Sequence, residues 1–321
     1  MLKTIGVVTP GGDAPGMNAA IRAVTRIAHS LNLQVLGFER GWDGLLSNRF
    51  KRLTPRAVGG IIQLGGTMLH TLRCPDFELK EGVEKATETL ALNKVDGLVV
   101  IGGDGSFRGA LDLSRESATL MVGIPATIDN DVFGTDETVG FDTAVNTAVA
   151  AIDKIRDTAI SHERLFIVEV MGRKRGFVAL NVGIAVGAEV ILIPEEEYKP
   201  SQVVDVLIEN SRKGKKAGVV VAAEGIGDTA ALAKEIEKQT GSEVRLSILG
   251  YSQRGGSPTA RSRLLASLFA EKAVDMLCLE QGNKVVGLQN GAISSIALEK
   301  SCKTQKPLDL HLLELAEMLA V

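Results

Sequence analysis

Short runs of apolar and β-branched residues alternate along the chain with longer segments in which apolar positions recur at helical spacing. The short runs have the length and composition of strands, and they lie at Lys3–Thr9, Gln34–Glu39, Gly97–Ile101, Met121–Ile124, Leu165–Val170, Val190–Ile193, Ala217–Ala223, Val244–Leu249 and Val285–Gln289. The helical spacing predicts helices at Met17–Leu31, Lys85–Leu92, Thr138–Ala159, Ser201–Lys213 and Thr229–Thr240. Because strands and helices take turns along the chain, we predict an α/β fold with mostly parallel sheets flanked by helices.

Length and composition narrow the class of protein. At 321 residues the chain is longer than a typical domain of roughly 100–200 residues, so two lobes are predicted. Apolar residues make up 45% and charged residues 23% of the chain, which is ordinary for a globular protein and excludes a disordered one. The net charge of -3 argues against nucleic-acid binding through bulk electrostatic attraction.

The cysteines and the N-terminal sequence indicate the compartment. Cys74, Cys278 and Cys302 are far apart and form no C-x-x-C pair, so neither a disulfide framework nor a zinc site is predicted. The first residues reach Gly, Pro and Asp within about ten positions, which interrupts the apolar region of a signal peptide, and no uncharged apolar run reaches about 18 residues. We therefore expect a cytoplasmic protein that does not span a membrane.

Glycine clusters follow several predicted strands, at the positions where α/β proteins place their sites. In Gly11–Gly16, glycines and the following helix N-terminus suit an anion, but the loop has neither the Lys-Ser/Thr of a P-loop nor the G-x-G-x-x-G pattern, so a plain tight turn is the alternative. Gly102–Ser106 places a carboxylate, that of Asp104, in a glycine loop that could bind phosphate. The two negative charges would repel each other unless a cation lay between the carboxylate and the phosphate. This predicts Mg²⁺ bound by Asp104 beside nucleotide phosphates, and a helix-capping Asp is the alternative.

Carboxylates and cations occupy further loops. The segment Pro125–Asp131 carries Asp129 and Asp131. One carboxylate can take a proton while the other positions that proton or the metal. An ordinary Asx turn is the alternative, because such turns are common. Met171–Gly176 and Gln253–Pro258 carry cations in glycine-bearing loops. Cations so placed suit a phosphorylated substrate or a migrating phosphoryl group, and a solvated basic turn is the alternative.

Taken together, the blocks GGDAPGMNAAIR, GGDGS, TIDND, MGRKRG and QRGGSP resemble, in order and spacing, those of the bacterial ATP-dependent 6-phosphofructokinases over essentially the whole chain. NAD kinases and lipid kinases have a loop similar to GGDGS but lack TIDND and QRGGSP, which leaves the wider kinase superfamily as the alternative enzyme class. A catalytically silent sugar-phosphate sensor would need its carboxylates to be lost, whereas Asp129 and Asp131 are both present.

The resemblance implies an activity and an architecture. The implied reaction transfers the γ-phosphoryl group of ATP to O1 of fructose 6-phosphate, giving fructose 1,6-bisphosphate and ADP in glycolysis, with Mg²⁺ as cofactor. The implied fold has two Rossmann-like lobes, a larger nucleotide-binding one of residues 1–140 and 253–303 and a smaller sugar-phosphate-binding one of residues 141–252 and 304–321. Family members are usually homotetramers with substrate and effector sites at subunit interfaces.

The same resemblance assigns catalytic and nucleotide-binding roles. Asp129 would be the base for the C1 hydroxyl, with Thr127 and Asp131 beside it, and Asp104 would hold Mg²⁺. Arg73 and Arg173 would neutralise charge on the phosphoryl group in flight, with Gly12 counted among the catalytic residues. The implied nucleotide contacts are Gly12, Arg73, Cys74, Gly103, Asp104, Gly105 and Ser106.

Sugar-phosphate and effector contacts are implied in the same way. The sugar-phosphate contacts are Thr127, Asp129, Met171, Gly172, Arg173, Glu224, Tyr251 and Arg254. A neighbouring subunit would bring Arg164 and Arg245 to the 6-phosphate. The effector contacts are Arg22, Arg26, Arg156, Gly187, Glu189, Lys213 and Lys215.

Departures from the family pattern fall at both ends of the site. Tyr251 stands where many members have a His, and its hydroxyl can form a hydrogen bond but brings no positive charge. Cys74 replaces a frequent Phe beside the nucleotide, and Glu78 stands where a basic residue is frequent. Affinity for the sugar phosphate and contacts to adenosine are therefore expected to differ from those of typical members.

Donor identity and regulation depend on single positions. Pyrophosphate-using relatives carry Asp and Lys where this chain has Gly105 and Ala126, so ATP is predicted, although Ala126 is not the usual Gly and pyrophosphate is the alternative donor. Pro55 occupies the slot of an effector-binding Arg, with Arg56 beside it. Because that Arg could pair with a phosphate through two hydrogen bonds, we expect activation by ADP or GDP and inhibition by phosphoenolpyruvate to be weak or altered.

Overall fold

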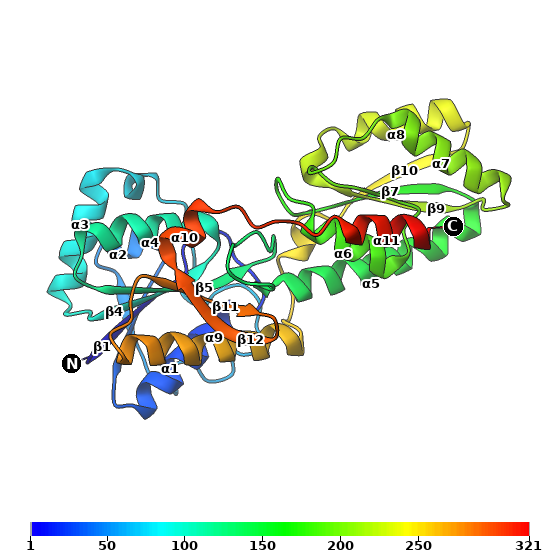
Figure 1. The fold of residues 1–321 in the computed structure, drawn as a ribbon. Coiled ribbons are helices and arrows are strands. Elements are labelled where there is room, and N and C mark those ends of the chain that lie inside the picture. Colours follow the sequence, from blue (N-terminus) through cyan, green and yellow to red (C-terminus); the bar gives the residue numbers. More distant parts are fainter. Residues whose placement is uncertain (1, 321) are drawn as a thin grey trace. The chain divides into compact units, whose positions relative to one another are not determined.

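A computed structural model describes residues 2–320 of the chain. The chain divides into two compact units, the first made of Met1–Thr143 and Arg254–Lys306 and the second of Ala144–Gln253 and Pro307–Val321. Each unit contains its own sheet with helices packed against it (Figure 1).

The sheet of the first unit is mostly parallel. Its strand order is β12-β11-β5-β4-β1-β2-β3, with the short β6 pairing to β5. The strands are β1 Thr4–Val8, β2 Gln34–Phe38, β3 Phe50–Leu53, β4 Gly97–Gly102, β5 Leu120–Thr127, β6 Val139–Gly140, β11 Lys284–Gln289 and β12 Ala292–Ala297. The two edge strands, β3 and β12, pair antiparallel to their neighbours, and the other pairs are parallel.

Helices cover both faces of this sheet. The helices are α1 Met17–Ser30, α2 Trp42–Leu46, α3 Lys80–Leu92, α4 Asp104–Glu116, α9 Ala260–Cys278 and α10 Leu298–Lys303. Helices α1 and α9 pack against each other on one face, and α2, α3, α4 and α10 form a second contiguous layer (Figure 1). Strands β1 and β4 are buried along their whole length, which explains why their sequences are almost continuously apolar.

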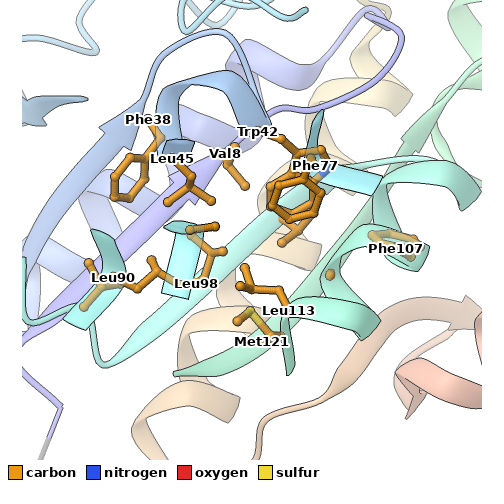
Figure 2. Packing of buried hydrophobic residues seen from close by; sticks show 14 of the residues in the cluster. Val8, Phe38, Trp42, Leu45, Phe77, Leu90, Leu98, Phe107, Leu113 and Met121 are labelled. Atoms are coloured by element: carbon orange, nitrogen blue, oxygen red, sulfur yellow. The ribbon is translucent and has the colours of Figure 1, made fainter. Parts of the chain in front are cut away.

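The core of the first unit contains a stacked aromatic pair. Figure 2 shows Trp42 and Phe77 face to face among buried aliphatic residues, and their ring centroids are 4.3 Å apart with planes 5° from parallel. Gly109 of α4 lies against this pair, since a Cβ placed there would be 2.9 Å from Trp42 Nε1. Because Trp42 is the one Trp in the sequence, its fluorescence reports on packing within the first unit.

The second unit has a four-stranded parallel sheet of order β10-β7-β9-β8. Its strands are β7 Leu165–Val170, β8 Val190–Leu192, β9 Gly218–Ala223 and β10 Val244–Ile248. Its helices are α6 Phe177–Val186, α7 Pro200–Arg212, α8 Thr229–Thr240 and α11 His311–Leu319, and α5 Phe141–His162 enters it from the first unit. Apolar residues of α7 and α8 form a core with β7, β8 and β9, while α6 and α11 pack on each other and on β8.

The predicted α/β class is confirmed, and most predicted elements are present within a few residues of their predicted bounds. The antiparallel edges β3 and β12 were not predicted, because their sequences FKRL and AISSIA lack the apolar runs of buried strands. Two predicted boundaries were wrong. Strand β5 continues to Thr127, and α5 begins at Phe141 because Val139–Gly140 pair with β5 instead.

No helix within residues 2–320 combines the length and the apolar character needed to cross a membrane. The longest described helix, α5, carries charged residues such as Asp153 and Lys154 along its sequence.

Replacing Phe107 tests the core of the first unit. Phe107 is 1% exposed, so Phe107→Ala leaves a cavity and should lower the free energy of unfolding by about 3–5 kcal/mol. Urea unfolding followed by Trp42 fluorescence measures this value for the first unit. Leu92→Ala is the control, because Leu92 is 72% exposed and its loss should change that free energy by less than about 0.5 kcal/mol. Equal effects of the two changes would contradict the packing described here.

Candidate active site

The candidate site of the first unit lies at the carboxyl ends of β1, β4 and β5. These strands are parallel neighbours in the sheet, so the loops that follow them leave the same edge. Those loops are Pro10–Gly16, Gly103 with the start of α4, and Ile128–Asp131. The sheet therefore brings together motifs that lie more than a hundred residues apart in the sequence.

The two glycine loops are in direct contact. Ser106 is buried, and its Oγ donates a hydrogen bond of 2.8 Å to the carbonyl of Pro10. Gly11 has a φ of 85° and lies so near that a Cβ would be 2.9 Å from Ser106 Oγ. Both the backbone conformation and the close approach therefore require glycine at this position.

The TIDND segment packs against the second glycine loop. A Cβ on Gly103 would lie 3.3 Å from the Cβ of Thr127. Thr127 Oγ1 accepts a 3.2 Å hydrogen bond from the backbone N–H of Asp129, and its carbonyl accepts one of 2.6 Å from Thr138 Oγ1. These contacts fix the turn that carries Asp129, whose residue surface is only 2% exposed.

Asn130 shapes the remainder of this loop. Its backbone has a φ of 52°, a conformation that Asn tolerates better than most residues. Its Oδ1 accepts the N–H of Thr138 at 3.0 Å, and its Nδ2 donates to the carbonyl of Asp136 at 3.1 Å. Asn130 thus orders the loop through both ends of its side-chain amide.

Asp104 begins helix α4 and is paired with an arginine one turn later. Arg108 Nε and Nη2 donate to Asp104 Oδ2 at 3.0 and 2.9 Å, and the pairing raises the pKa of Arg108. The N-cap is Gly103, so the Asp104 side chain does not cap the helix. Within residues 2–320 no three His, Cys, Asp or Glu side chains cluster as a metal cage. Mg²⁺ commonly binds one or two carboxylates together with substrate phosphates, and Asp104 fits that mode.

Two cationic segments border the first glycine loop. Thr71 Oγ1 donates a 2.6 Å hydrogen bond to the carbonyl of Gly11, which ties the segment carrying Arg73 to this loop. A Cβ on Gly12 would lie 3.5 Å from Arg254 Nη2, so the guanidinium group of Arg254 lies against Gly12. The site of the first unit therefore combines a buried carboxylate, a helix-start carboxylate and positive charge.

The second unit has its own cluster in the loop that follows β7. Gln253 Oε1 accepts the N–H of Met171 at 2.9 Å, and Glu224 Oε1 accepts those of Gly172 and Arg173 at 3.1 and 2.6 Å. At the far end of the loop Glu195 Oε1 accepts the N–H of Gly176 at 3.1 Å. The Arg175 guanidinium group lies 3.0 Å from the same oxygen and 5.2 Å from the centre of the Phe177 ring. Its positive charge is therefore paired with Glu195.

Arg164 and Arg245 meet on a shared carboxylate. Arg164 Nε lies 2.5 Å from Glu243 Oε2, and Arg245 forms an ion pair with Glu243 Oε1. Hydrogen bonding from Arg164 is the main cause that lowers the pKa of Glu243. A carboxylate held between two guanidinium groups occupies a position that suits a phosphate equally well.

The residues implied for effector binding are only partly brought together. Arg156 Nη2 donates to the carbonyls of Val186 and Gly187 at 2.6 and 3.1 Å, and Arg156 Nη1 lies 3.9 Å from Glu189 Oε1. Two further lysines have other partners, because Lys213 pairs with Glu209 and Lys215 donates to the carbonyl of Ala320. Arg22 and Arg26 lie one turn apart on α1 of the first unit.

A family profile described as phosphofructokinase matches residues 4–277. The chain belongs to the phosphofructokinase family. ATP-dependent 6-phosphofructokinase 1 of Thermus thermophilus is 50% identical over 322 residues and covers the whole of both chains. ATP-dependent 6-phosphofructokinase of Clostridium botulinum is 48% identical over 319 residues, 99% of this chain and 100% of that protein.

Solved phosphofructokinase structures have the same fold. The Pichia pastoris enzyme in the T-state is 35% identical with a TM-score of 0.88, over 94% of this chain and 35% of that longer one. Pyrophosphate-dependent phosphofructokinase from Marinobacter aquaeolei superimposes with a TM-score of 0.85 at 23% identity and supports the fold alone. The family fold predicted from the sequence blocks is thus confirmed.

Several side chains that contact the candidate site residues were not predicted from the sequence. Arg108 is one of them, although its i,i+4 spacing from Asp104 is a signal that was present in the sequence. Glu243 was missed although Arg245 is only two residues away, because its other partner, Arg164, is distant in the sequence. Gln253 opens the QRGGSP block, but its contact with Met171 joins positions 82 residues apart and gave no signal in the sequence. The sequence also places Pro125–Thr127 in a loop, whereas they close strand β5.

Cys302 offers a test of the electrostatics near Asp104. Burial, followed by the charge of Asp104, raises the pKa of its thiol to about 11. Because the thiolate is the reactive form, Cys302 should be alkylated slowly at pH 7.5, with a rate that rises about tenfold per pH unit until the pH approaches that pKa. Peptide mass spectrometry after iodoacetamide treatment measures the rate, and the exposed Cys278 serves as the internal control. Labelling of Cys302 as fast as Cys278 at pH 7.5 would show that the thiol is not shielded in this way.

Proposed function

We propose that this chain is an ATP-dependent 6-phosphofructokinase that transfers the γ-phosphoryl group of ATP to O1 of fructose 6-phosphate. The observation that carries the proposal is the convergence, within the first unit, of both glycine loops with the segment that holds Asp129. The relatives whose whole length this chain matches at 48% and 50% identity bear the name of that activity. Sequence blocks and named relatives thus support one reaction.

Asp129 is the proposed general base. It takes the proton of the C1 hydroxyl as O1 forms its bond to the γ-phosphorus atom and the bond from that atom to the bridging oxygen of ADP breaks. The contact of Thr127 Oγ1 with the N–H of Asp129 keeps the carboxylate-bearing turn in place. Thr127 and Asp131 flank the base, and in phosphoryl transfer such positioning contributes much of the rate.

The donor phosphates are assigned to the glycine loops. Gly12, Gly103 and Gly105 present backbone groups, and the uncapped start of α4 adds a favourable dipole for an anion. Mg²⁺, held by Asp104 and the donor phosphates, would supply positive charge to the phosphoryl oxygens. Arg73 adds charge from the segment tied to Gly11, and Ser106 orders the loop through its bond to Pro10. Cys74 follows Arg73 and is assigned to the nucleotide's adenosine end.

Contacts to the sugar phosphate are proposed for Met171, Gly172, Glu224 and Arg254. Met171, Gly172 and Glu224 belong to one hydrogen-bonded cluster, which supports a joint role for them. Arg173 would neutralise the transferred phosphoryl group, and Tyr251 would offer a hydroxyl.

Arg164 and Arg245 are proposed to grip the 6-phosphate of a neighbouring subunit's substrate in a homotetramer. Their shared contact with Glu243 supports a joint role, because a phosphate carries the same kind of charge as that carboxylate. The remaining family assignment is the effector site, for which Arg156, Gly187 and Glu189 already lie together. The cytoplasm is the proposed compartment.

The choice of donor rests on two small residues. Open space surrounds the position that a Cβ of Gly105 would take, so a nucleotide's α-phosphate meets no side chain there. Ala126 is fully buried within β5. Of the two positions, Gly105 is the one that favours ATP over pyrophosphate.

A donor comparison tests the proposed activity. Purified protein with fructose 6-phosphate and Mg²⁺ should form fructose 1,6-bisphosphate with ATP and not with pyrophosphate. A coupled assay run with ATP, GTP and pyrophosphate measures the three rates. Product formation with pyrophosphate alone would replace the proposed donor, and no product with any of the three would refute the activity.

Asp129→Asn tests the proposed base. Because a positioned general base contributes about 10² to 10⁴ in rate, the change should lower kcat by that factor. The KM values for both substrates should change little, and Trp42 fluorescence should confirm that the first unit is folded. Asn130→Asp would disrupt the neighbouring turn but leave the base, so it separates loss of the carboxylate from loss of loop order. A kcat for Asp129→Asn close to that of the unmodified protein would exclude the role.

A further inference from the structure

Three consecutive backbone N–H groups of the loop Met171–Gly176 are accepted by side chains. Met171 donates to Gln253 Oε1, and Gly172 and Arg173 both donate to Glu224 Oε1. Unlike N–H groups within β7, these have no strand to pair with at this point, since β7 ends at Val170. The side chains therefore replace a strand as the partner of the loop's backbone.

The loop has a conformation that the chain does not adopt readily by itself. Gly172 has a φ of 143° and Arg173 a φ of 53°. The second value lies in the left-handed region, which a non-glycine residue populates sparsely and keeps only where surrounding contacts hold it. The acceptors at Gln253 and Glu224 supply such contacts.

Gln253 is a fully buried amide that uses only its oxygen in this contact. It is 0% exposed, and its Nε2 has no hydrogen-bond partner. An unpaired buried donor is unfavourable, and an apolar side chain of the same length would avoid it. What the amide does supply is the acceptor for Met171, at the end of the 3₁₀ helix Gly250–Gln253.

We propose that Gln253 is a positioning residue that, with Glu224, holds the loop Met171–Gly176 in the conformation that binds the sugar phosphate. The proposal rests on the function proposed above, because Met171, Gly172 and Arg173 are the loop residues assigned to that substrate. Gln253 acts through the backbone of Met171 and does not itself contact the reacting atoms. Loss of its acceptor releases the start of the loop, and with it the placement of Arg173.

Backbone amide exchange tests the contact without any substrate. Gln253→Met keeps the side chain's length but removes the acceptor, and should make the Met171 amide exchange about tenfold faster. Gln253→Glu keeps an oxygen at the same reach and should retain most of the protection. Asn210→Leu is the matched control, since Asn210 is also buried in the second unit and its Nδ2 also has no hydrogen-bond partner. It should leave exchange at Met171 unchanged.

Steady-state kinetics then connect the contact to the substrate. Gln253→Met should raise the KM for fructose 6-phosphate about tenfold and lower kcat, with the KM for ATP changed by less than about twofold. Gln253→Glu should recover the sugar-phosphate KM in part, and Asn210→Leu should leave both KM values unchanged.

The outcomes separate this proposal from the function on which it rests. If the unmodified protein does not phosphorylate fructose 6-phosphate, the proposed function fails, and the exchange experiment still decides whether Gln253 holds the loop. Slow Met171 exchange in Gln253→Met would overturn the positioning role. An equal rise of the sugar-phosphate KM in Asn210→Leu would overturn it as well, because replacement of any buried amide in the second unit would then explain the effect.

Discussion

The parallel pairing of β4 with β1 on one side and β5 on the other is the constraint on which the candidate site depends. β4 is buried over its whole length, so it can only be a central strand, and its apolar sequence leaves no solvent-exposed alternative. With three parallel strands side by side, their following loops must leave from one edge. The glycine loops and the Asp129 segment therefore meet whatever their distance along the chain.

Close approach of these loops depends on the absence of side chains. The hydrogen bond from Ser106 to Pro10 spans 96 residues of sequence and brings Gly11 against the serine hydroxyl. Gly103 lies as near to Thr127. Glycine at these points exposes backbone N–H groups for an anion and lets the carboxylate-bearing segment come close. One residue type thus serves both the packing and the proposed chemistry.

In the second unit, the loop that follows β7 is held by side-chain hydrogen-bond acceptors, whereas the loops of the first unit approach each other through glycines. Glu224, Gln253 and Glu195 bind backbone N–H groups of a single loop, and Arg175 is held inside it. Glu224 accepts two of these N–H groups, and Gln253 and Glu195 accept one each, so the backbone of the loop is fixed at four points. The loop's cations consequently differ in role, because the Arg175 side chain pairs with Glu195 while the backbone of Arg173 carries the last of the three consecutive anchored N–H groups.

The sequence by itself determined the α/β class, the positions of most strands and the residues that can do chemistry. Apolar periodicity and glycine clusters are local signals, and strands such as β7 and helices such as α8 have the predicted bounds. The five sequence blocks also led to the phosphofructokinase family, which the family profile confirms.

Only the tertiary structure decided which of these residues touch. It set the order of the strands and the antiparallel edges β3 and β12, and it showed that Arg108 pairs with Asp104 and that Glu243 joins Arg164 to Arg245. The contact between Gln253 and Met171 joins residues 82 positions apart. Apart from the i,i+4 spacing of Asp104 and Arg108 and the two-residue spacing of Glu243 and Arg245, such contacts are decided by the packing of whole strands and loops, and residue spacing along one segment does not reveal them.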